Sequence, residues 1–288
     1  MKKIIRYLRK GLCSVSPILA NKVMYRILMK RRLDLKNPQT FNEKINWLKL
    51  YKYPNDLLVI KCSDKYMVRK YVESKGLANI LNELYGVYES AEEIQWEKLP
   101  KEFVIKCNHG CGYNIICDNK EKLDISESNR LIKNWMNEDF GKVSCEPHYS
   151  KIERKIICEK YLGKNILDYK FFCFNGKPEF LYISRAIAGS HHGLKADFFN
   201  LDGTKMPFRR IDHESFDVVP SMMENFEAAK KICEILSKDF SFVRVDLFEV
   251  DDKIYFSELT FTPCTGMMPL EPKQYDKLLG DLIKMEEM

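Results

Sequence analysis

The sequence predicts an α+β fold that lacks the regular strand and helix alternation of a doubly wound sheet. Residues 17–90 have mostly helical patterns, whereas short strand-like runs and helices are mixed from residue 103 onward. Irregularly interspersed strands and helices favour α+β packing over a parallel sheet. The length of 288 residues suits one large domain or two average ones, because a domain holds roughly 150 residues.

The helix signals near the N-terminus are specific. Thr40 and Glu43 have the spacing of a capping box and precede an apolar helical face. A second helix is predicted to begin at Ser63 or Asp64 and to stop at Gly76.

Two more helices and eight strands are predicted further along the chain. One helix includes residues 131–136 and ends near Gly141, and the other covers residues 222–237 and begins with Ser221 and Glu224 at capping-box spacing. The predicted strands are residues 103–107, 115–118, 155–162, 169–174, 180–184, 196–201, 242–250 and 254–261.

The composition is that of a globular protein. Hydrophobic residues make up 45% of the chain and charged residues 31%, which excludes collagen, low-complexity disorder and a disulfide mini-scaffold. No apolar run reaches the roughly 20 residues that a membrane-spanning helix needs. Residues 11–20 are interrupted by Ser14, Ser16 and Pro17, so we expect no secretion signal. The ten cysteines show no framework spacing, and we interpret them as reduced thiols of a cytoplasmic protein.

Positive charge is concentrated at the N-terminus. Residues 1–35 contain ten Lys and Arg against one acid, Asp34, for a net charge of +9, and the remaining residues sum to −3. Because the body is slightly acidic, we expect no nucleic-acid partner. Four apolar residues recur at helical spacing among the first cations: Ile4, Ile5, Leu8 and Leu12. This amphipathic helix either lies on an anionic membrane at its inner face or packs its apolar edge on the body of the protein.

The last two predicted strands carry paired acids. By period two, Arg244 and Asp246 share one face of their strand, and Glu258 and Thr260 share a face of the next. A three-residue loop would place Asp246 opposite Glu258, whereas a two-residue loop would place the carboxylates on opposite faces. Like charges directly opposite call for a cation, and hard oxygen ligands select Mg²⁺. Solvation of both acids, or bridging to Arg and Lys, is the alternative.

A lysine followed by two glycines suggests a polyphosphate site. The predicted strand 103–107 delivers Lys106 to a turn that contains Gly110 and Gly112, and glycines let backbone N–H groups approach an oxyanion. No Gly-Lys-Ser/Thr begins a helix, so the turn is not a Walker loop. Cys107, His109 and Cys111 also raise a zinc site, but no second ligand pair follows, and we do not expect one.

A further polar cluster lies between two groups of predicted strands. It comprises residues 158–163, followed by Asp168 and Lys170. Clefts between domains are common ligand sites, although this cluster alone indicates nothing specific.

In order along the chain, these motifs resemble the ATP-grasp family. The matching pieces are Asp64-Lys65, residues 103–106 with the glycine loop, residues 159–162, Asp168-x-Lys170, Arg185, Arg244-x-Asp246 and Glu258-x-Thr260. Residues 37–47, 106–110 and 168–171 resemble more narrowly the TupA-like branch, which is associated with bacterial teichuronopeptide, capsule or other surface-polysaccharide synthesis. The resemblance implies two α+β subdomains that close on ATP, here expected at residues 96–163 and 164–288, after a mainly helical region at 1–95.

The resemblance also implies a role for each matching residue. Lys65 and Lys106 would hold the α- and β-phosphates, and the loop from His109 through Gly110 and Gly112 would fold over the triphosphate. The adenine hinge would be formed mostly by backbone groups of four residues: Glu159, Lys160, Tyr161 and Leu162.

The remaining roles concern the ribose, the reacting centre and the metal. Asp168 would bind the ribose, Lys170 and Arg185 would face the γ-phosphate, and Arg244 would stabilise the reacting centre. Mg²⁺ would be held by Asp246 and Glu258, with Thr260 where many family members have Asn. A hydroxyl is a weaker ligand than an amide oxygen, which puts a second Mg²⁺ in doubt.

The implied activity is ATP-dependent ligation of a carboxylate to an amine through an acylphosphate. The substrates would be a glycan or sugar carboxylate and an amine donor, either an amino acid or an amino sugar. His191, His192 and Lys195 are candidates for contact with the acceptor, although surface loops often carry such residues. A metal-dependent glycosyltransferase of the same pathway and a non-catalytic scaffold are the alternatives.

Overall fold

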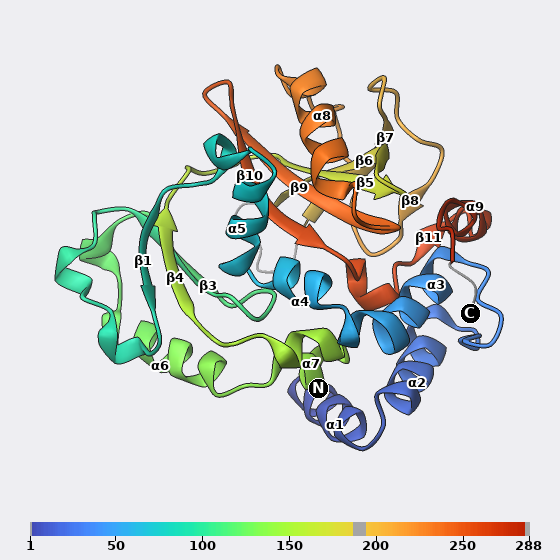
Figure 1. Cartoon of the computed structure of the whole chain (residues 1–288), viewed down its shortest axis with the longest axis horizontal. Coiled ribbons are helices and arrows are strands. Elements are labelled where there is room, and N and C mark those ends of the chain that lie inside the picture. The colour runs from blue at the N-terminus through green and yellow to red at the C-terminus, as the bar shows by residue number, and fades with distance from the viewer. Residues whose placement is uncertain (1, 187–193, 286–288) are drawn as a thin grey trace.

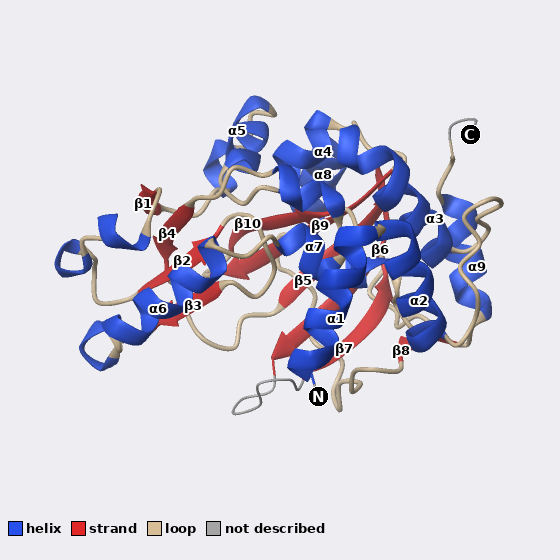
Figure 2. Ribbon diagram, turned by 90° about the horizontal axis from the view of Figure 1, so that it is seen from below, coloured by secondary structure: helices blue, strands red, loops and turns tan. Residues whose placement is uncertain are grey.

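The computed structural model describes residues 2–186 and 194–285, with side chains for residues 9–185 and 194–285. Two antiparallel sheets lie side by side in these residues, beside a helical region formed mainly by the N-terminal part of the chain (Figures 1 and 2). In the described part, the first sheet has four strands in the order β1-β4-β2-β3, and the second has five in the order β10-β9-β5-β6-β7. The short strands β11 and β8 form a separate ribbon.

The bounds of the elements follow the chain. The strands are β1 (Leu84–Tyr88), β2 (Phe103–Cys107), β3 (Asn114–Cys117), β4 (Ile156–Lys160), β5 (Asp168–Phe174), β6 (Lys177–Ala186), β7 (Leu194–Asn200), β8 (Arg209–Arg210), β9 (Phe242–Val250), β10 (Lys253–Thr260) and β11 (Leu270–Glu271). The helices are α1 (Lys2–Val15), α2 (Pro17–Met29), α3 (Phe41–Trp47), α4 (Leu57–Ser63), α5 (Met67–Ser74), α6 (Ile125–Met136), α7 (Phe140–Ser144), α8 (Phe226–Ser237) and α9 (Gln274–Leu282).

The first sheet includes a strand that the sequence did not reveal. β1 lies in the region predicted to be mostly helical, yet it pairs antiparallel with β4, with Val87 opposite Ile157. All five residues of β1 are half-buried, so the strand lacks the alternation of buried and exposed positions that marks a strand in sequence. The predicted subdomain boundary at residues 163 and 164 falls between β4 and β5.

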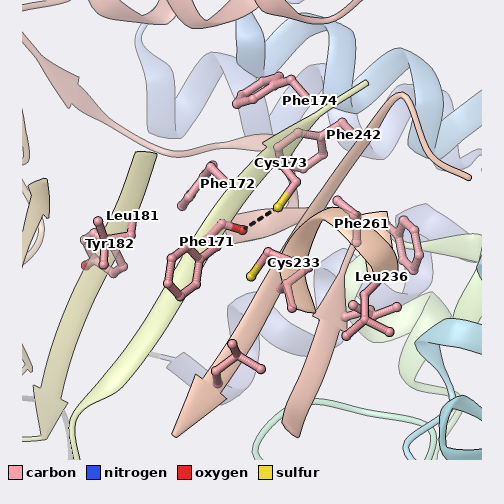
Figure 3. Packing of buried hydrophobic residues seen from close by; sticks show 14 of the residues in the cluster. Phe171, Phe172, Cys173, Phe174, Leu181, Tyr182, Cys233, Leu236, Phe242 and Phe261 are labelled. Carbon is pink, nitrogen blue, oxygen red and sulfur yellow. Dashed lines mark hydrogen bonds between the residues drawn. The ribbon is translucent and has the colours of Figure 1, made fainter. Parts of the chain in front are cut away.

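Both faces of the second sheet are covered. On one face Phe171 contacts Phe226 of α8, with ring centroids 5.8 Å apart, and Cys173 lies beside Cys233 of the same helix (Figure 3). On the other face Phe172 contacts Phe41 of α3 at 6.2 Å. Asp168 and Lys170 continue that second face along β5 by period two, so the polar site and the α3 contact share one side of the sheet.

The start of α8 corrects one prediction. The helix begins at Phe226, and not at residue 222, and Ser221 and Glu224 do not form its cap. Instead, Glu249 of β9 accepts hydrogen bonds from the backbone N–H groups of Glu224 (2.8 Å) and Asn225 (3.0 Å). A carboxylate at this position satisfies helix N–H groups that have no partner within the helix.

The N-terminal helices agree better with the sequence. The capping box of Thr40 and Glu43 is confirmed at the start of α3. Asp64 precedes α5 as predicted, and its Oδ1 accepts from the N–H groups of Tyr66 and Met67, although the regular helix begins only at Met67.

The predicted amphipathic helix at the N-terminus is α1. Its residues Leu12 and Cys13 pack against Cys145, at the end of α7. The side chains of Ile4, Ile5 and Leu8 lie outside the described residues. None of the helices in residues 2–186 and 194–285 has the length and hydropathy needed to cross a bilayer.

The cap at α8 can be tested by substitution. Glu249→Ala should lower the free energy of unfolding by about 1 kcal/mol, because two helix N–H groups lose their acceptor. Urea denaturation measures this difference. Glu234→Ala, at an exposed position of the same helix, should change the free energy by less than about 0.5 kcal/mol. Equal effects of the two substitutions would contradict the capping role.

Candidate active site

The two predicted metal acids face each other, but for a different reason than expected. Asp246 lies opposite Glu258 across β9 and β10. The loop between the strands has two residues, Asp251 and Asp252, both with positive φ, and not the predicted three. A β-bulge between Phe256 and Glu258 shifts the register by one residue. The bulge therefore restores the facing carboxylates that a two-residue loop alone would separate.

Arg244 joins these acids to Thr260. Its guanidinium donates to both carboxylate oxygens of Asp246, at 2.7 and 2.6 Å, and to the hydroxyl of Thr260 at 3.1 Å. The same group lies 3.4 Å from Glu258, which also accepts from the Thr260 hydroxyl at 2.9 Å. The four side chains form one hydrogen-bonded cluster on a single face of the hairpin.

Strand β5 adds a cation and a third acid. Lys170 lies opposite Asp246, because β5 pairs with β9, and its Nζ is 3.9 Å from the Asp246 carboxylate. Lys170 also forms an ion pair with Asp168, two residues earlier on the same face. Asp168 is thereby connected to the two acids of the hairpin.

Lys65 connects this cluster to the first sheet. Its Nζ donates to the carbonyl of Gly110 at 2.6 Å and lies 4.0 Å from Glu258. Asn108 fixes the geometry, because its amide donates to Asp64 at 2.9 Å while its carbonyl accepts from the Lys65 N–H at 3.2 Å. The sequence analysis did not identify Asn108, although it lies in the motif that follows Lys106.

The glycine loop presents backbone and not the imidazole. A Cβ at Gly110 would lie 2.7 Å from the Tyr113 ring, and Gly112 has a φ of +76°. His109 is buried, and its Nε2 lies 3.1 Å from the carbonyl of Trp135. Its side chain therefore supports the loop from behind, which corrects the expectation that it covers a triphosphate.

The cysteines of this loop diverge. Cys107 is buried in the core of the first sheet, whereas Cys111 is exposed. In the residues that the structure describes, no three His, Cys, Asp or Glu side chains are grouped to hold a metal ion.

A second cluster forms around Glu159. Glu159 pairs with Lys106 at 2.7 Å and with Arg69 at 3.1 Å, and it is itself buried. Arg69 lies four residues after Lys65, one helical turn away. Both cations of the cluster therefore have a counter-ion on β4.

The segment after Glu159 leads out of the first sheet. The backbone N–H of Lys160 donates to Glu83, and its carbonyl accepts from Asn82 at 2.8 Å. Tyr161 and Leu162 follow as half-buried residues between the two sheets in sequence.

Arg185 and Lys195 are not part of the site cluster. Lys170 pairs with Tyr182 on β6, so by period two Arg185 lies on the opposite face of the sheet. This corrects the expectation that Arg185 faces the γ-phosphate. Lys195 lies opposite Arg185 on β7 and forms an ion pair with Asp217. His191 and His192 lie outside the described residues.

Burial and opposite charges act against each other on the acids. Burial raises the pKa of Asp246 to about 6, although Arg244 and Lys170 act in the other direction. Burial also raises that of Glu258, but Lys65 and Arg244 outweigh it and hold the pKa of Glu258 below its ordinary value. Burial opposes the charge of Arg244, yet Asp246 and Glu258 keep its pKa above the usual range.

A fully buried lysine supports the turn after β10. Lys49 donates to the carbonyl of Thr265, which has a positive φ, and to Asn21 of α2 at 2.7 Å. Thr262, in the same turn, donates to the buried carboxylate of Glu146. These contacts join residues more than 100 positions apart, and no local signal in the sequence predicts them.

Comparison with known proteins agrees with this arrangement. A family model described as TupA-like ATPgrasp matches residues 43–284. None of the curated proteins matches the sequence.

Several solved ligase structures are similar. D-alanine–D-alanine ligase from Bacillus anthracis, complexed with ATP, has 19% identity and a TM-score of 0.48 over 77% of this chain and 65% of that chain. For D-alanyl-alanine synthetase A from Vibrio cholerae the values are 12%, 0.46, 84% and 68%. For N5-carboxyaminoimidazole synthetase from Staphylococcus aureus, complexed with ADP, they are 12%, 0.44, 80% and 54%. This chain thus spans about two thirds of the first ligase, and the family match carries the assignment.

The protein has the ATP-grasp fold, which confirms the fold class expected from the sequence. Because the family model covers most of the chain, the protein belongs to the TupA-like ATP-grasp family, as the resemblance of its motifs predicted.

The raised pKa of Asp246 predicts a pH dependence of stability. Its ordinary value is 3.8, so between about pH 4 and pH 6 the folded protein keeps a proton that the unfolded chain has lost. In wild type this group lowers the free energy of unfolding as the pH rises through that window. Asp246→Asn removes the contribution, so the difference between the two unfolding curves should change by up to about 3 kcal/mol. Urea denaturation at several pH values measures it, and parallel curves would contradict the assignment.

Proposed function

We propose that this protein is an ATP- and Mg²⁺-dependent ligase that joins a carboxylate to an amine and forms ADP. The observation that carries the proposal is the continuous run of contacts from the Gly110 carbonyl through Lys65 to Glu258 and on to Asp246. This run joins a glycine loop of one sheet to paired acids of the other, so phosphates between them would meet backbone N–H groups, cations and a metal ion.

The donor set fits Mg²⁺. Two carboxylates face each other, and Mg²⁺ usually takes one or two carboxylates, several waters and substrate phosphates for its remaining ligands. Arg244 now occupies both oxygens of Asp246, so metal binding requires its guanidinium to move. When bound, Mg²⁺ would neutralise negative charge on the phosphates.

The cations fit a nucleotide that lies between the sheets. Lys65 and Lys106 would hold the α- and β-phosphates, and Lys170 would approach the γ-phosphate from β5. Asp168, half-buried at the start of that strand, would accept from the ribose hydroxyls. Tyr161 and Leu162 would offer backbone groups to the adenine, because the Lys160 backbone already bonds to Glu83 and Asn82.

The reaction would proceed in two balanced steps. A carboxylate oxygen attacks the γ-phosphorus, the bond to the β-phosphate oxygen breaks, and ADP leaves. The amine nitrogen then attacks the carbonyl carbon of the acylphosphate, inorganic phosphate leaves, and the amine loses a proton. Lys170 and Arg244 would stabilise charge that develops on the transferring phosphoryl group.

The substrates follow from the family association with surface polysaccharides. The acceptor would be a uronic acid or another carboxylate of a bacterial surface glycan, and the donor an amino acid or an amino sugar. Polar acceptor chemistry agrees with a site lined by Lys, Arg and Thr side chains.

Turnover tests the metal pair. ADP release from ATP should appear with a panel of uronic-acid glycans and amino acids, and Asp246→Asn or Glu258→Gln should each reduce it at least about 100-fold. Asp281→Asn, which alters an exposed carboxylate paired only with Lys277, is the matched control and should retain activity. Normal turnover in both site variants, with folding intact, would eliminate the ligase mechanism. Release of a nucleoside diphosphate from a nucleotide sugar, without ATP, would indicate a glycosyltransferase.

Nucleotide affinity tests the second cluster. Lys106→Ala should weaken ATP binding by about tenfold, because one charge-assisted contact to phosphate is lost. Glu159 would keep Arg69 as its partner, so the fold should survive. Isothermal titration calorimetry measures the change. Unaltered affinity would place the phosphates away from Lys106 and would favour a scaffold that merely retains the fold.

A further inference from the structure

Helix α2 exposes an aliphatic stripe. Leu19, Val23 and Ile27 lie four residues apart, and 48%, 39% and 52% of their surfaces are exposed. Side chains at this spacing follow one face of a helix. The opposite face is buried through Ala20, Asn21 and Tyr25. The stripe therefore faces outward from the edge of the molecule where α1 and α2 lie (Figures 1 and 2).

Cations surround this stripe. Lys22, Arg26 and Lys30 are exposed and, at 100° per residue, fall in the same half of the helix as the aliphatic side chains. No acidic residue occurs in α2. An apolar stripe among cations has the chemistry of a helix that lies on an anionic bilayer.

A basic cavity adjoins the same face. It has a volume of about 410 Å³, and its lining includes Lys22, Arg32, Lys36, Asp34, Leu35 and Tyr51. Asp34 is the single acid among these residues, and its carboxylate accepts from the backbone N–H groups of Lys36 and Asn37 at 2.9 and 3.0 Å. Three cations against one engaged carboxylate leave a positive cavity, and the exposed Tyr51 ring suits a membrane interface.

We propose that the exposed face of α2 and the cavity beside it bind an anionic phospholipid surface, with the cavity receiving a headgroup phosphate. The aliphatic side chains enter the acyl boundary, and the cations contact phosphates around them. A second copy of the chain fits this face less well, because Lys22, Arg26 and Lys30 would meet their own like charges. Nucleic acid would use the cations but not the aliphatic stripe.

The other face of α2 leads toward the site. Asn21 accepts from Lys49, and Lys49 donates to Thr265 in the turn that follows β10. The membrane-facing helix is thus connected through one side chain to the segment after the metal acids. Resting on the proposed function, this placement indicates an acceptor carboxylate carried by a lipid-linked glycan at the bilayer surface.

Vesicle co-sedimentation with the full chain tests the surface independently of catalysis. The protein should sediment with phosphatidylglycerol mixed into phosphatidylcholine, should release as salt is added, and should not sediment with phosphatidylcholine alone. The apolar variant Leu19→Gln, Val23→Gln, Ile27→Gln and the charge variant Lys22→Gln, Arg26→Gln, Arg32→Gln should each bind at least about tenfold less.

The matched control changes exposed aliphatic residues elsewhere. Ile235→Gln with Leu278→Gln alters exposed positions of α8 and α9 and should bind vesicles like wild type. Circular dichroism should show the same helix content in every variant, and ADP formation with a soluble acceptor should be unchanged. This readout separates a failure of the surface from a failure of the ligase.

Three results would overturn the proposal. They are equal binding to neutral and anionic vesicles, wild-type binding by both triple variants, and a dimer in light scattering that the apolar variant dissociates while vesicles are not bound.

Discussion

Two carboxylates held face to face on neighbouring strands set the demands on the rest of this site. The bulge at Ser257 places Glu258 opposite Asp246, and their repulsion in a largely dry environment requires cations nearby. Arg244 and Lys170 supply two of them from within the sheet, and Lys65 reaches the pair from the start of α5. The opposed shifts in pKa of the two acids reflect this balance between burial and charge.

The same requirement explains how the two sheets cooperate. Lys65 contacts both the Gly110 carbonyl and Glu258, so one side chain bridges the glycine loop and the hairpin. Asn108 and Asp64 fix the backbone on either side of that lysine. A nucleotide that enters between the sheets would therefore exchange internal ion pairs for contacts to its phosphates, which need little rearrangement of the backbone. Closure around the phosphates would also exclude water from an acylphosphate.

Sequence reasoning reached the parts of this arrangement that depend on local pattern. Period two along β9 and β10 placed Asp246 and Glu258 on usable faces, and the ordered motifs identified the family. The loop length was wrong, because a bulge at a serine leaves no distinctive mark in the sequence. Strand β1 was missed since it does not alternate, and Arg185 was assigned without a register that would fix its face. The contacts of Lys49 join distant segments, so only the folded chain reveals them.

The central claim is that Asp246 and Glu258 share a divalent cation with the nucleotide phosphates. A crystal structure with Mn²⁺ and a non-hydrolysable ATP analogue tests it most directly, because anomalous scattering locates the metal without ambiguity. We expect a manganese peak within coordination distance of both carboxylates, with the phosphates on the side of Lys65 and Gly110. A bound nucleotide whose metal lies away from these two side chains would contradict the account.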